Sequence, residues 1–456
     1  MIILPYHDYY PHQWDFFKNC VFGDKRFAYI RWCRRAGKDD CFINALCIKM
    51  QETVGLYAYI LPYYSQVRKT VWENIGEDGK RFIDYFPDEL VERRRDQDMT
   101  IIFKNGSILK FVGSDNFESL RGWNPIGIVQ AEYQDHRPQA NADLLPIIIR
   151  NNGFMWKNGV HPETRNHAYQ LWNNAINEGS YFTSEETWHT AEKSPGVPLY
   201  TEEQKRLAKN EMKQEEIDTN FEMRLPAQSE RYIYSKIMNN LHERKQILDF
   251  HLDSRLPCDT YWDLGVSNVY ASMAIWVIQD AKTHFNAVAY FDGCGHGVVD
   301  YIEIIKEFCT KKNLRLGRHF CPHDGVNNKD YFEGKSLIGR AAEFGVKFEC
   351  PVSMKSVKSG IQNVIDILPQ VFIHKSYCES GIAALEQYQR MYDKTKNVYG
   401  APLHDEFSHG SDAFRYFAQI KSRRTLKVKE NLLDSMFRKD DTSQVTQKFR
   451  RIPGGD

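Results

Sequence analysis

Residues 27–51 have the sequence FAYIRWCRRAGKDDCFINALCIKMQ, which sets the class of the first domain. The first five residues predict a short apolar strand, the next seven a basic loop, and the rest a helix with apolar residues at helical spacing. A loop in this setting suits phosphate binding, because its backbone N–H groups can surround the phosphate oxygens. Gly37 and Lys38 fit the pattern G-x-x-x-x-G-K-[ST], but Trp32 replaces its first Gly and Asp39 its hydroxyl residue. On this pattern alone, a plain basic turn before a helix is the stronger interpretation.

More strands follow this unit and favour an α/β sheet with mainly parallel strands. Residues 56–61 and 126–129 are short apolar runs, and residues 100–112 predict a hairpin around an Asn-Gly turn. The second apolar run leads into Glu132. In ATPases that have such a phosphate-binding loop, an Asp at the position before this Glu holds Mg²⁺ through water, and the Glu activates the attacking water. Ala131 cannot do the first of these, whereas Glu132 can do the second or can simply end a strand in solvent.

The C-terminal half predicts a ribonuclease H-like fold. Three strand-like runs between residues 258 and 292 suggest an antiparallel meander, and helix–strand alternation follows. Two-metal hydrolysis of a phosphodiester needs several converging carboxylates, and this half offers Asp263 in the first strand, Asp324 at the end of a later strand and Asp412 on the last helix. Taken singly, each acid fits a cap or a surface position. His409 lies three residues before Asp412, so both share one helix face, where His409 could move a proton, orient a ligand or only pack.

Length and composition are compatible with this organisation. The chain has 456 residues, enough for two or three domains, and contains no apolar run of the roughly 18 residues that a membrane span needs. Lys plus Arg and Asp plus Glu both number 60, so bulk charge gives no argument for or against nucleic acid. Residues 421–456 hold ten basic and five acidic residues, a net charge of +5. The ten cysteines form no C-x-x-C pair, so we expect reduced, mostly buried thiols in a cytosolic protein.

Several short motifs make the chain resemble the large subunit of tailed-bacteriophage terminases, the motors that package DNA, over residues 5–420. The sequence Arg34-Arg35-Ala36-Gly37-Lys38 is similar to the family's R-R/Q-x-G-K phosphate loop. Other elements similar to the family's ATPase motifs are Gln13 upstream of the loop, the second ATPase motif at 62–68, the S-x-R-G element at 119–122, and the segment at 162–167 that couples hydrolysis to movement. The motifs D-L-G, P-H-D and S-H-x-x-D-A-x-R-Y are similar to those of the family's nuclease.

The resemblance implies an α/β protein with an N-terminal P-loop (RecA/ASCE-like) ATPase domain on a mainly parallel sheet and a C-terminal RNase H-like nuclease domain. The expected ranges are residues 1–205 for the ATPase, 206–254 for a connector, 255–422 for the nuclease and 423–456 for a mobile basic tail. It also implies that ATP and Mg²⁺ are bound by Gln13, Arg34, Arg35, Gly37, Lys38 and Asp39, with Glu132 and Arg34 catalytic. Asp263, Asp324 and Asp412 would hold Mg²⁺ or Mn²⁺ in the nuclease.

The implied activity is ATP-driven movement of double-stranded DNA into a procapsid and metal-dependent cutting of concatemeric DNA. The implied partners are double-stranded DNA, the portal of the procapsid, a small terminase subunit and about four further copies in a ring of about five. The expected location is the host cytoplasm, transiently at the portal vertex, with no membrane. Basic side chains at Lys355, Lys358 and in the tail could contact DNA or only solvent.

Departures from the family pattern leave alternatives open. Asp39, Ala131, His161 and Thr164 replace the residues usual at their positions. Our hypothesis is that Asp39 holds Mg²⁺ in place of the acid missing at 131. The competing interpretations are a weak or inactive ATPase, hence a nuclease with a decayed ATPase domain, or a scaffold without enzymatic activity. Of the two arginines, we expect Arg34 to face the γ-phosphate.

Overall fold

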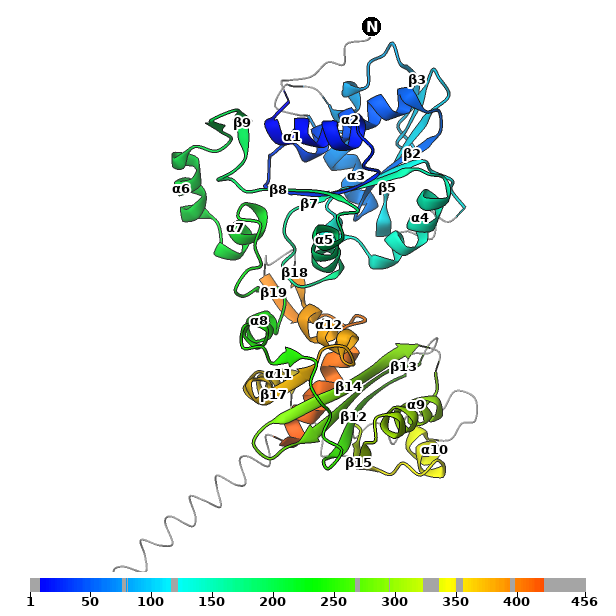
Figure 1. Ribbon diagram of the computed structural model, residues 1–456, viewed down its shortest axis with the longest axis vertical. Coiled ribbons are helices and arrows are strands. Elements are labelled where there is room, and N and C mark those ends of the chain that lie inside the picture. Colours follow the sequence, from blue (N-terminus) through cyan, green and yellow to red (C-terminus); the bar gives the residue numbers. More distant parts are fainter. Residues whose placement is uncertain are drawn as a thin grey trace, which may run out of the picture. The chain divides into compact units, whose positions relative to one another are not determined.

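The computed structural model describes residues 9–75, 79, 81–115, 122–266, 271–294, 296–322, 336–349, 356–393 and 398–421. The chain divides into two compact units, Met1–Ser229 and Glu230–Asp456 (Figure 1). The division falls within residues 206–254, the segment expected to be a connector. Each unit has its own sheet and its own hydrophobic core. In the described part of the chain, no helix combines the length and apolar composition that crossing a membrane requires.

The first unit is built on an eight-stranded sheet of order β3-β4-β5-β2-β6-β7-β1-β8. Its five pairings from β5 to β8 are parallel, and β3, β4 and β5 pair antiparallel. The predicted hairpin is confirmed as β4 and β5, with Gly106 at φ +90° in the turn. The strands are β1 (Phe27–Trp32), β2 (Leu56–Leu61), β3 (Val91–Arg95), β4 (Thr100–Phe103), β5 (Ile108–Gly113), β6 (Gly127–Gln130), β7 (Phe154–Gly159) and β8 (Phe182–Glu186), with a separate pair β9 (Glu192–Ser194) and β10 (Val197–Pro198).

Helices cover both faces of this sheet, as apolar parallel strands require. The helices are α1 (Pro11–Phe16), α2 (Lys38–Glu52), α3 (Tyr64–Val67), α4 (Pro138–Arg150), α5 (His167–Glu178), α6 (Glu202–Glu211) and α7 (Gln214–Asn220), with shorter turns η1 (Phe17–Val21), η2 (Arg68–Trp72), η3 (Phe82–Tyr85) and η5 (Tyr133–Asp135). Phe42 of α2 packs with Trp156 of β7 in the largest core cluster. The neighbouring Met155 packs with Leu144 and Ile148 of α4 instead. Because strand side chains alternate, α2 and α4 lie on opposite faces.

The second unit has a seven-stranded sheet of order β11-β17-β14-β13-β12-β15-β16. The predicted meander is confirmed, because β12, β13 and β14 pair antiparallel, and β15 then returns parallel to β12. The strands are β11 (Ile247–Leu248), β12 (Pro257–Val266), β13 (Ala271–Asp280), β14 (Phe285–Cys294), β15 (Arg315–Phe320), β16 (Phe348–Glu349) and β17 (Val371–His374), with a separate hairpin β18 (Arg390–Asp393) and β19 (Val398–Pro402). The helices are α8 (Ser235–Glu243), α9 (Val298–Lys311), α10 (Leu337–Glu343), α11 (Val357–Ile367) and α12 (Glu379–Gln387), with η7 (Leu368–Gln370) and a final helix at residues 408–421.

The two faces of this second sheet pack against different helices. Figure 1 shows α9 and α10 beside the meander strands. Trp262 and Ile275 pack with residues of α9 and α10 in one cluster. Tyr261 and Trp276 pack in the other cluster with Phe414 and other residues of helix 408–421. Asp263 lies two residues after Tyr261, so it faces the same side of the sheet as the final helix.

Candidate functional site

The basic loop of the first unit is tied to α1 by two side chains. His12 Nε2 donates to the carbonyl of Ala36 at 2.9 Å, and Gln13 Nε2 donates to the carbonyl of Gly37 at 2.9 Å. Gly37 has a φ of +72°, and a Cβ there would lie 2.4 Å from Gln13 Nε2, so both backbone conformation and space require Gly. Gln13 Oε1 accepts the N–H of Tyr10 at 2.9 Å. Both Nε2 and Oε1 of Gln13, which is expected to bind ATP, therefore have a hydrogen-bond partner within the chain.

The three basic side chains of the loop fall into two kinds. Lys38 is buried, and its Nζ donates to the carbonyls of Trp32 at 3.2 Å and Cys33 at 3.5 Å. Arg34 and Arg35 are exposed, and neither guanidinium has a recorded hydrogen bond or ion pair with the described residues. Arg35 has a φ of +61°, a left-handed conformation that is uncommon for a residue with a side chain. Both guanidinium groups are therefore available to an anionic ligand.

Two carboxylates lie beside this loop. Asp39, in the first turn of α2, accepts hydrogen bonds at Oδ1 from the Tyr59 hydroxyl at 2.5 Å and from Asn158 Nδ2 at 3.3 Å. The backbone N–H of Glu132 donates to Oδ1 of the same Asn158 at 3.2 Å. Gln134 Nε2 donates to Glu132 Oε2 at 2.8 Å. A single buried amide therefore contacts both the α2 carboxylate and the turn that bears Glu132.

The backbone and charge at these two acids are unusual. Glu132 has φ +56° and ψ +49°, a left-handed conformation that costs energy in a non-Gly residue and often accompanies a functional site. Burial, with the nearby Glu132 carboxylate as a second cause, raises the pKa of Asp39. A cation bound between these two carboxylates is favourable, because it offsets the electrostatic repulsion between their negative charges. Lys38, Asp39 and Glu132 therefore fit a magnesium nucleotide, with Lys38 and the arginines toward phosphate, Asp39 toward the metal and Glu132 toward water.

The segment expected to couple hydrolysis to movement contacts the Glu132 turn directly. Asn166 caps α5, since its Oδ1 accepts the N–H groups of Ala168 at 3.1 Å and Tyr169 at 3.2 Å. Its Nδ2 donates to the carbonyl of Gln134 at 2.9 Å, and His167 Nε2 lies 3.2 Å from the carbonyl of Tyr133. The turn after Glu132 and the start of α5 are therefore held together by side-chain hydrogen bonds.

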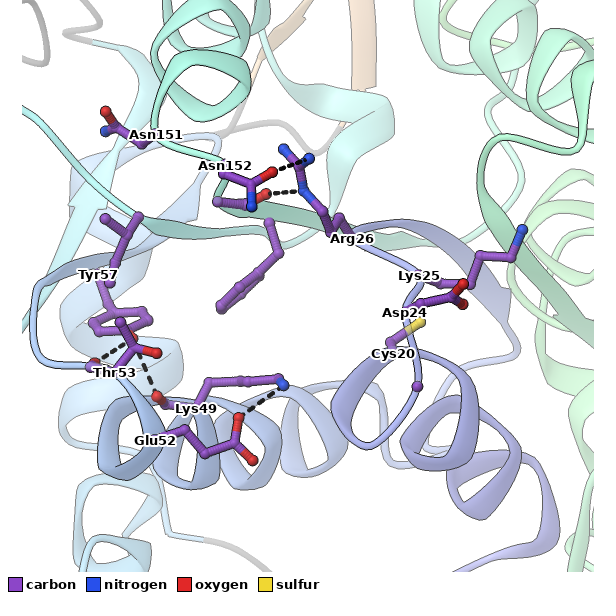
Figure 2. Close-up of a pocket in the computed structure, with 14 residues that line it drawn as sticks. Cys20, Asp24, Lys25, Arg26, Lys49, Glu52, Thr53, Tyr57, Asn151 and Asn152 are labelled. Atoms are coloured by element: carbon purple, nitrogen blue, oxygen red, sulfur yellow. Dashed lines mark hydrogen bonds and ion pairs between the residues drawn. The ribbon is translucent and has the colours of Figure 1, made fainter.

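A cavity of about 380 Å³ lies at the end of the sheet opposite the basic loop (Figure 2). Its walls include Tyr57 at the start of β2, Phe154 at the start of β7, and Lys49 near the end of α2. The basic loop and Glu132 follow the carboxyl ends of β1 and β6, whereas this cavity is at the amino ends of the strands. None of the expected nucleotide-binding residues lines it.

In the second unit, the final helix brings two expected site residues to the first strand of the meander. Gly410 allows the approach, because a Cβ there would lie 2.5 Å from the Tyr290 hydroxyl oxygen and 2.6 Å from Ala384 Cβ. Trp276 Nε1 donates to the Gly410 carbonyl at 2.8 Å and fixes the helix on the sheet. His409 Nδ1 consequently reaches Asp263 Oδ2 at 2.9 Å.

Each acid of this second site is paired with a basic side chain. Asp263 accepts from His409, and this hydrogen bond raises the pKa of His409. Arg415, one turn further along the helix, is buried and donates to Asp412. Burial raises the pKa of Asp412 to about 6, with Arg415 opposing the change and Asp263 adding to it. An acid whose pKa is raised by burial and by a neighbouring carboxylate is suited to bind a divalent cation, which can replace the proton.

Asp324, the third expected nuclease ligand, lies outside the described residues, as does Lys355. Asp405, an acid just before the final helix, has local partners: its Oδ1 accepts the N–H of Phe407 at 3.0 Å, and its Oδ2 accepts from Gln389 Nε2 at 3.0 Å. Over the described ranges, no three His, Cys, Asp or Glu side chains are placed to hold a metal ion together. Asp263 and Asp412 are the two expected ligands that lie within the described residues.

Comparison with known proteins gives structural neighbours only. No protein-family model and no curated protein sequence matches the chain. The large terminase of a thermophilic bacteriophage is 14% identical, with 91% of this chain and 99% of that chain covered and a TM-score of 0.40. The structural neighbours are bacteriophage large terminases.

Single domains of other large terminases are also among the structural neighbours. The ATPase domain of the Thermus phage P74-26 large terminase is 11% identical, covers 49% of this chain and 96% of its own, and has a TM-score of 0.38. The large terminase nuclease domain from bacteriophage SPP1, solved with bound Mn, is 14% identical, covers 35% of this chain and 84% of its own, and has a TM-score of 0.25.

Sequence reasoning missed four residues that build these two sites. Tyr59, Asn158 and Gln134 hold the two carboxylates of the first site, and Gly410 allows the helix of the second site to approach its strand. Polar residues inside the apolar strands β2 and β7 were the available signal for Tyr59 and Asn158. A Gly within a helical pattern was the signal for Gly410.

Proposed function

We propose that this chain is the large subunit of a phage terminase, which uses ATP to move double-stranded DNA into a procapsid and cuts concatemeric DNA with a metal-dependent nuclease. The observation that supports this most is the presence of two separate chemical centres, one in each unit. Lys38, Asp39 and Glu132 gather around one loop. Asp263 and Asp412 gather at one strand and one helix. Portal, small subunit, a ring of about five copies and the host cytoplasm belong to the same proposal.

In the first centre, the residues divide the work of ATP hydrolysis. Lys38 neutralises charge on the β- and γ-phosphates, and Arg34 stabilises the charge that develops on the transferred group. Glu132 accepts hydrogen bonding from the attacking water and aligns it, while Gln134 keeps the Glu132 carboxylate oriented. A bound Mg²⁺ would supply further charge neutralisation, with Asp39 as the residue that holds it. The contacts from Asn166 and His167 to the Glu132 turn would pass its movement to α5.

In the second centre, Asp263 and Asp412, with Asp324, would hold the ions. Bound Mg²⁺ or Mn²⁺ would supply a nucleophilic hydroxide and charge neutralisation for phosphodiester hydrolysis. His409 orients Asp263 through its 2.9 Å hydrogen bond. Arg415 keeps Asp412 in place from its buried position.

Packaging of linear DNA into purified procapsids with ATP tests the proposal. Lys38→Ala should abolish packaging, because the phosphates lose their buried cation, and Asp412→Ala should spare it. Packaging by Lys38→Ala at the wild-type rate would contradict the proposal.

A second candidate, a DNA nuclease with a decayed ATPase domain, is favoured by one observation. Ala131 is buried and has no group that can bind a metal. DNA-stimulated ATP turnover in the wild type, lost in Glu132→Gln, would exclude this candidate. The double substitution Asp39→Ser with Ala131→Asp should recover turnover that Asp39→Ser loses, and no recovery would contradict a relocated metal carboxylate.

A further inference from the structure

The carboxylate of Asp39 is held by one oxygen only. Oδ1 accepts from the Tyr59 hydroxyl at 2.5 Å and from Asn158 Nδ2 at 3.3 Å. Within the described ranges, no hydrogen bond to Oδ2 is recorded. A carboxylate with both donors on one oxygen has a fixed orientation and a free second oxygen.

The two donors come from strands on either side of the Glu132 strand. Tyr59 lies on β2 and Asn158 on β7, and β6 runs between these strands. Tyr59 and Asn158 are both fully buried, so neither side chain can turn to solvent. Since Asn158 also accepts the N–H of Glu132 at 3.2 Å, the orientation of Asp39 is set against the turn that bears Glu132.

We propose that Tyr59 and Asn158 are positioning residues, which orient Asp39 so that Oδ2 stays available to the divalent cation that accompanies a nucleotide. The inference rests on the proposed function, in which the loop at 34–38 binds ATP. Residues that hydrogen-bond a metal ligand fix its rotation and change metal affinity when they are removed. Without Tyr59, Asp39 would lose its shortest hydrogen bond and could rotate toward the Lys38 ammonium.

The same strand provides a matched control. Tyr57 is also buried, lies two residues before Tyr59 and faces the same side of the sheet. Its hydroxyl donates to the carbonyls of Thr53 at 2.6 Å and Lys49 at 3.1 Å, at the far end of α2 (Figure 2). Tyr57→Phe therefore removes a buried hydroxyl that contacts α2 but leaves Asp39 untouched.

The test is nucleotide binding by the full chain, measured calorimetrically with ATPγS in EDTA and across a Mg²⁺ titration. In Tyr59→Phe, the gain in affinity that Mg²⁺ provides should fall about tenfold, as expected for loss of a residue that orients a metal ligand. Binding in EDTA should stay within about twofold of wild type. Asn158→Ala should show the same selective loss, and Tyr57→Phe should match wild type in both conditions.

Three results would overturn the inference. One is an unchanged Mg²⁺ effect in Tyr59→Phe and Asn158→Ala; another is an equal loss in Tyr57→Phe, which would place the effect in α2 as a whole. The third is equal weakening with and without Mg²⁺ in folded protein. If Tyr59→Phe does not fold, the Mg²⁺ effect in Asn158→Ala alone decides the test. Wild-type protein that binds no ATPγS would instead refute the proposed ATPase function itself.

Discussion

Lys157 is a buried lysine that gives a quantitative prediction about stability. Its side chain on β7 is fully buried, and no hydrogen-bond partner for Nζ is found in the described residues. Its register neighbours Gln130 and Tyr29 also have buried polar atoms without a partner there. The nearest compensating contact is the ring of Tyr133, whose centroid is 5.1 Å from Nζ. Lys157 should therefore destabilise the first unit.

The size of the effect follows from the pKa of Lys157. Burial lowers this pKa from 10.5 to about 7, so the folded state disfavours the charged form. Burying the Lys157 ammonium therefore lowers the free energy of unfolding. This loss is fully present below pH 7 and amounts to about 5 kcal/mol, since each pKa unit corresponds to about 1.4 kcal/mol. Between pH 7 and 10.5 the unfolded chain binds the extra proton, so stability rises with pH. At pH 9 about 2 kcal/mol of the cost remains.

Lys157→Met keeps the length of the side chain and removes its charge. After loss of the contact with Tyr133, worth about 1 to 2 kcal/mol, the variant should be about 3 kcal/mol more stable than wild type at pH 7. The difference should fall to about 2 kcal/mol at pH 9, because the amine of the folded protein is then neutral and has no cation–π contact to lose, and it should vanish near pH 10.5. Urea midpoints of the first unit, read from β6 and β7 peptides by pulse-labelling hydrogen exchange and mass spectrometry, measure both values.

Lys110→Met is the matched control. Lys110 is only partly buried, and its Nζ lies 4.3 Å from the ring centroid of Trp123, so the substitution removes a cation–π contact without relieving a buried charge. It should lower stability by less than about 1 kcal/mol at both pH values. If Lys157→Met is no more stable than wild type at pH 7, or if its advantage is the same at pH 9, the ammonium has a partner and the reasoning fails.

Three other predictions concern two buried histidines, the close packing of the final helix on its sheet, and the N-cap of α5. Burial lowers the pKa of His136 and of His161 to about 3, so the unfolded chain binds protons first below pH 6.5, and stability should fall by about 2 kcal/mol per histidine from pH 7 to 5; urea midpoints that do not move would contradict this. Gly410→Ala should cost about 1 to 3 kcal/mol by overpacking and reduce Mn²⁺-dependent plasmid nicking, whereas Gly400→Ala, whose Cβ would meet nothing nearer than 3.8 Å, should do neither. Asn166→Ala should cost about 1 kcal/mol as a lost cap. Asn166→Asp can still cap, so it should keep most of that stability yet lose as much DNA-stimulated ATPase as the Ala variant; full ATPase in Asn166→Asp would show that the hydrogen bond to the turn after Glu132 is dispensable.

The sequence predicted those elements whose signal is local. β1, β2 and β6 are continuous apolar runs, as expected for strands buried on both faces. The hairpin at β4 and β5 was predictable because its Asn-Gly turn needs a left-handed residue, which Gly106 provides. The meander of the second unit was predictable from three strands joined by short links.

Non-local features were beyond the reach of sequence reasoning. The order of the eight strands depends on long-range pairing, and only this order puts Tyr59 and Asn158 on either side of the Glu132 strand. The left-handed backbone of Glu132 has no signal in residue type, since Gly or Asn is the usual residue there. The hydrogen bond from Gln13 to the Gly37 carbonyl joins two segments that are 24 residues apart, and no local pattern in the sequence indicates that they are neighbours.

The central claim is that one chain has two chemically independent centres. The most direct measurement is DNA-stimulated ATP hydrolysis and Mn²⁺-dependent plasmid nicking on the same preparations of wild type, Lys38→Ala and Asp412→Ala. We expect Lys38→Ala to lose ATP hydrolysis and keep nicking, and Asp412→Ala to lose nicking and keep ATP hydrolysis. Wild-type levels of both activities in both variants would contradict it.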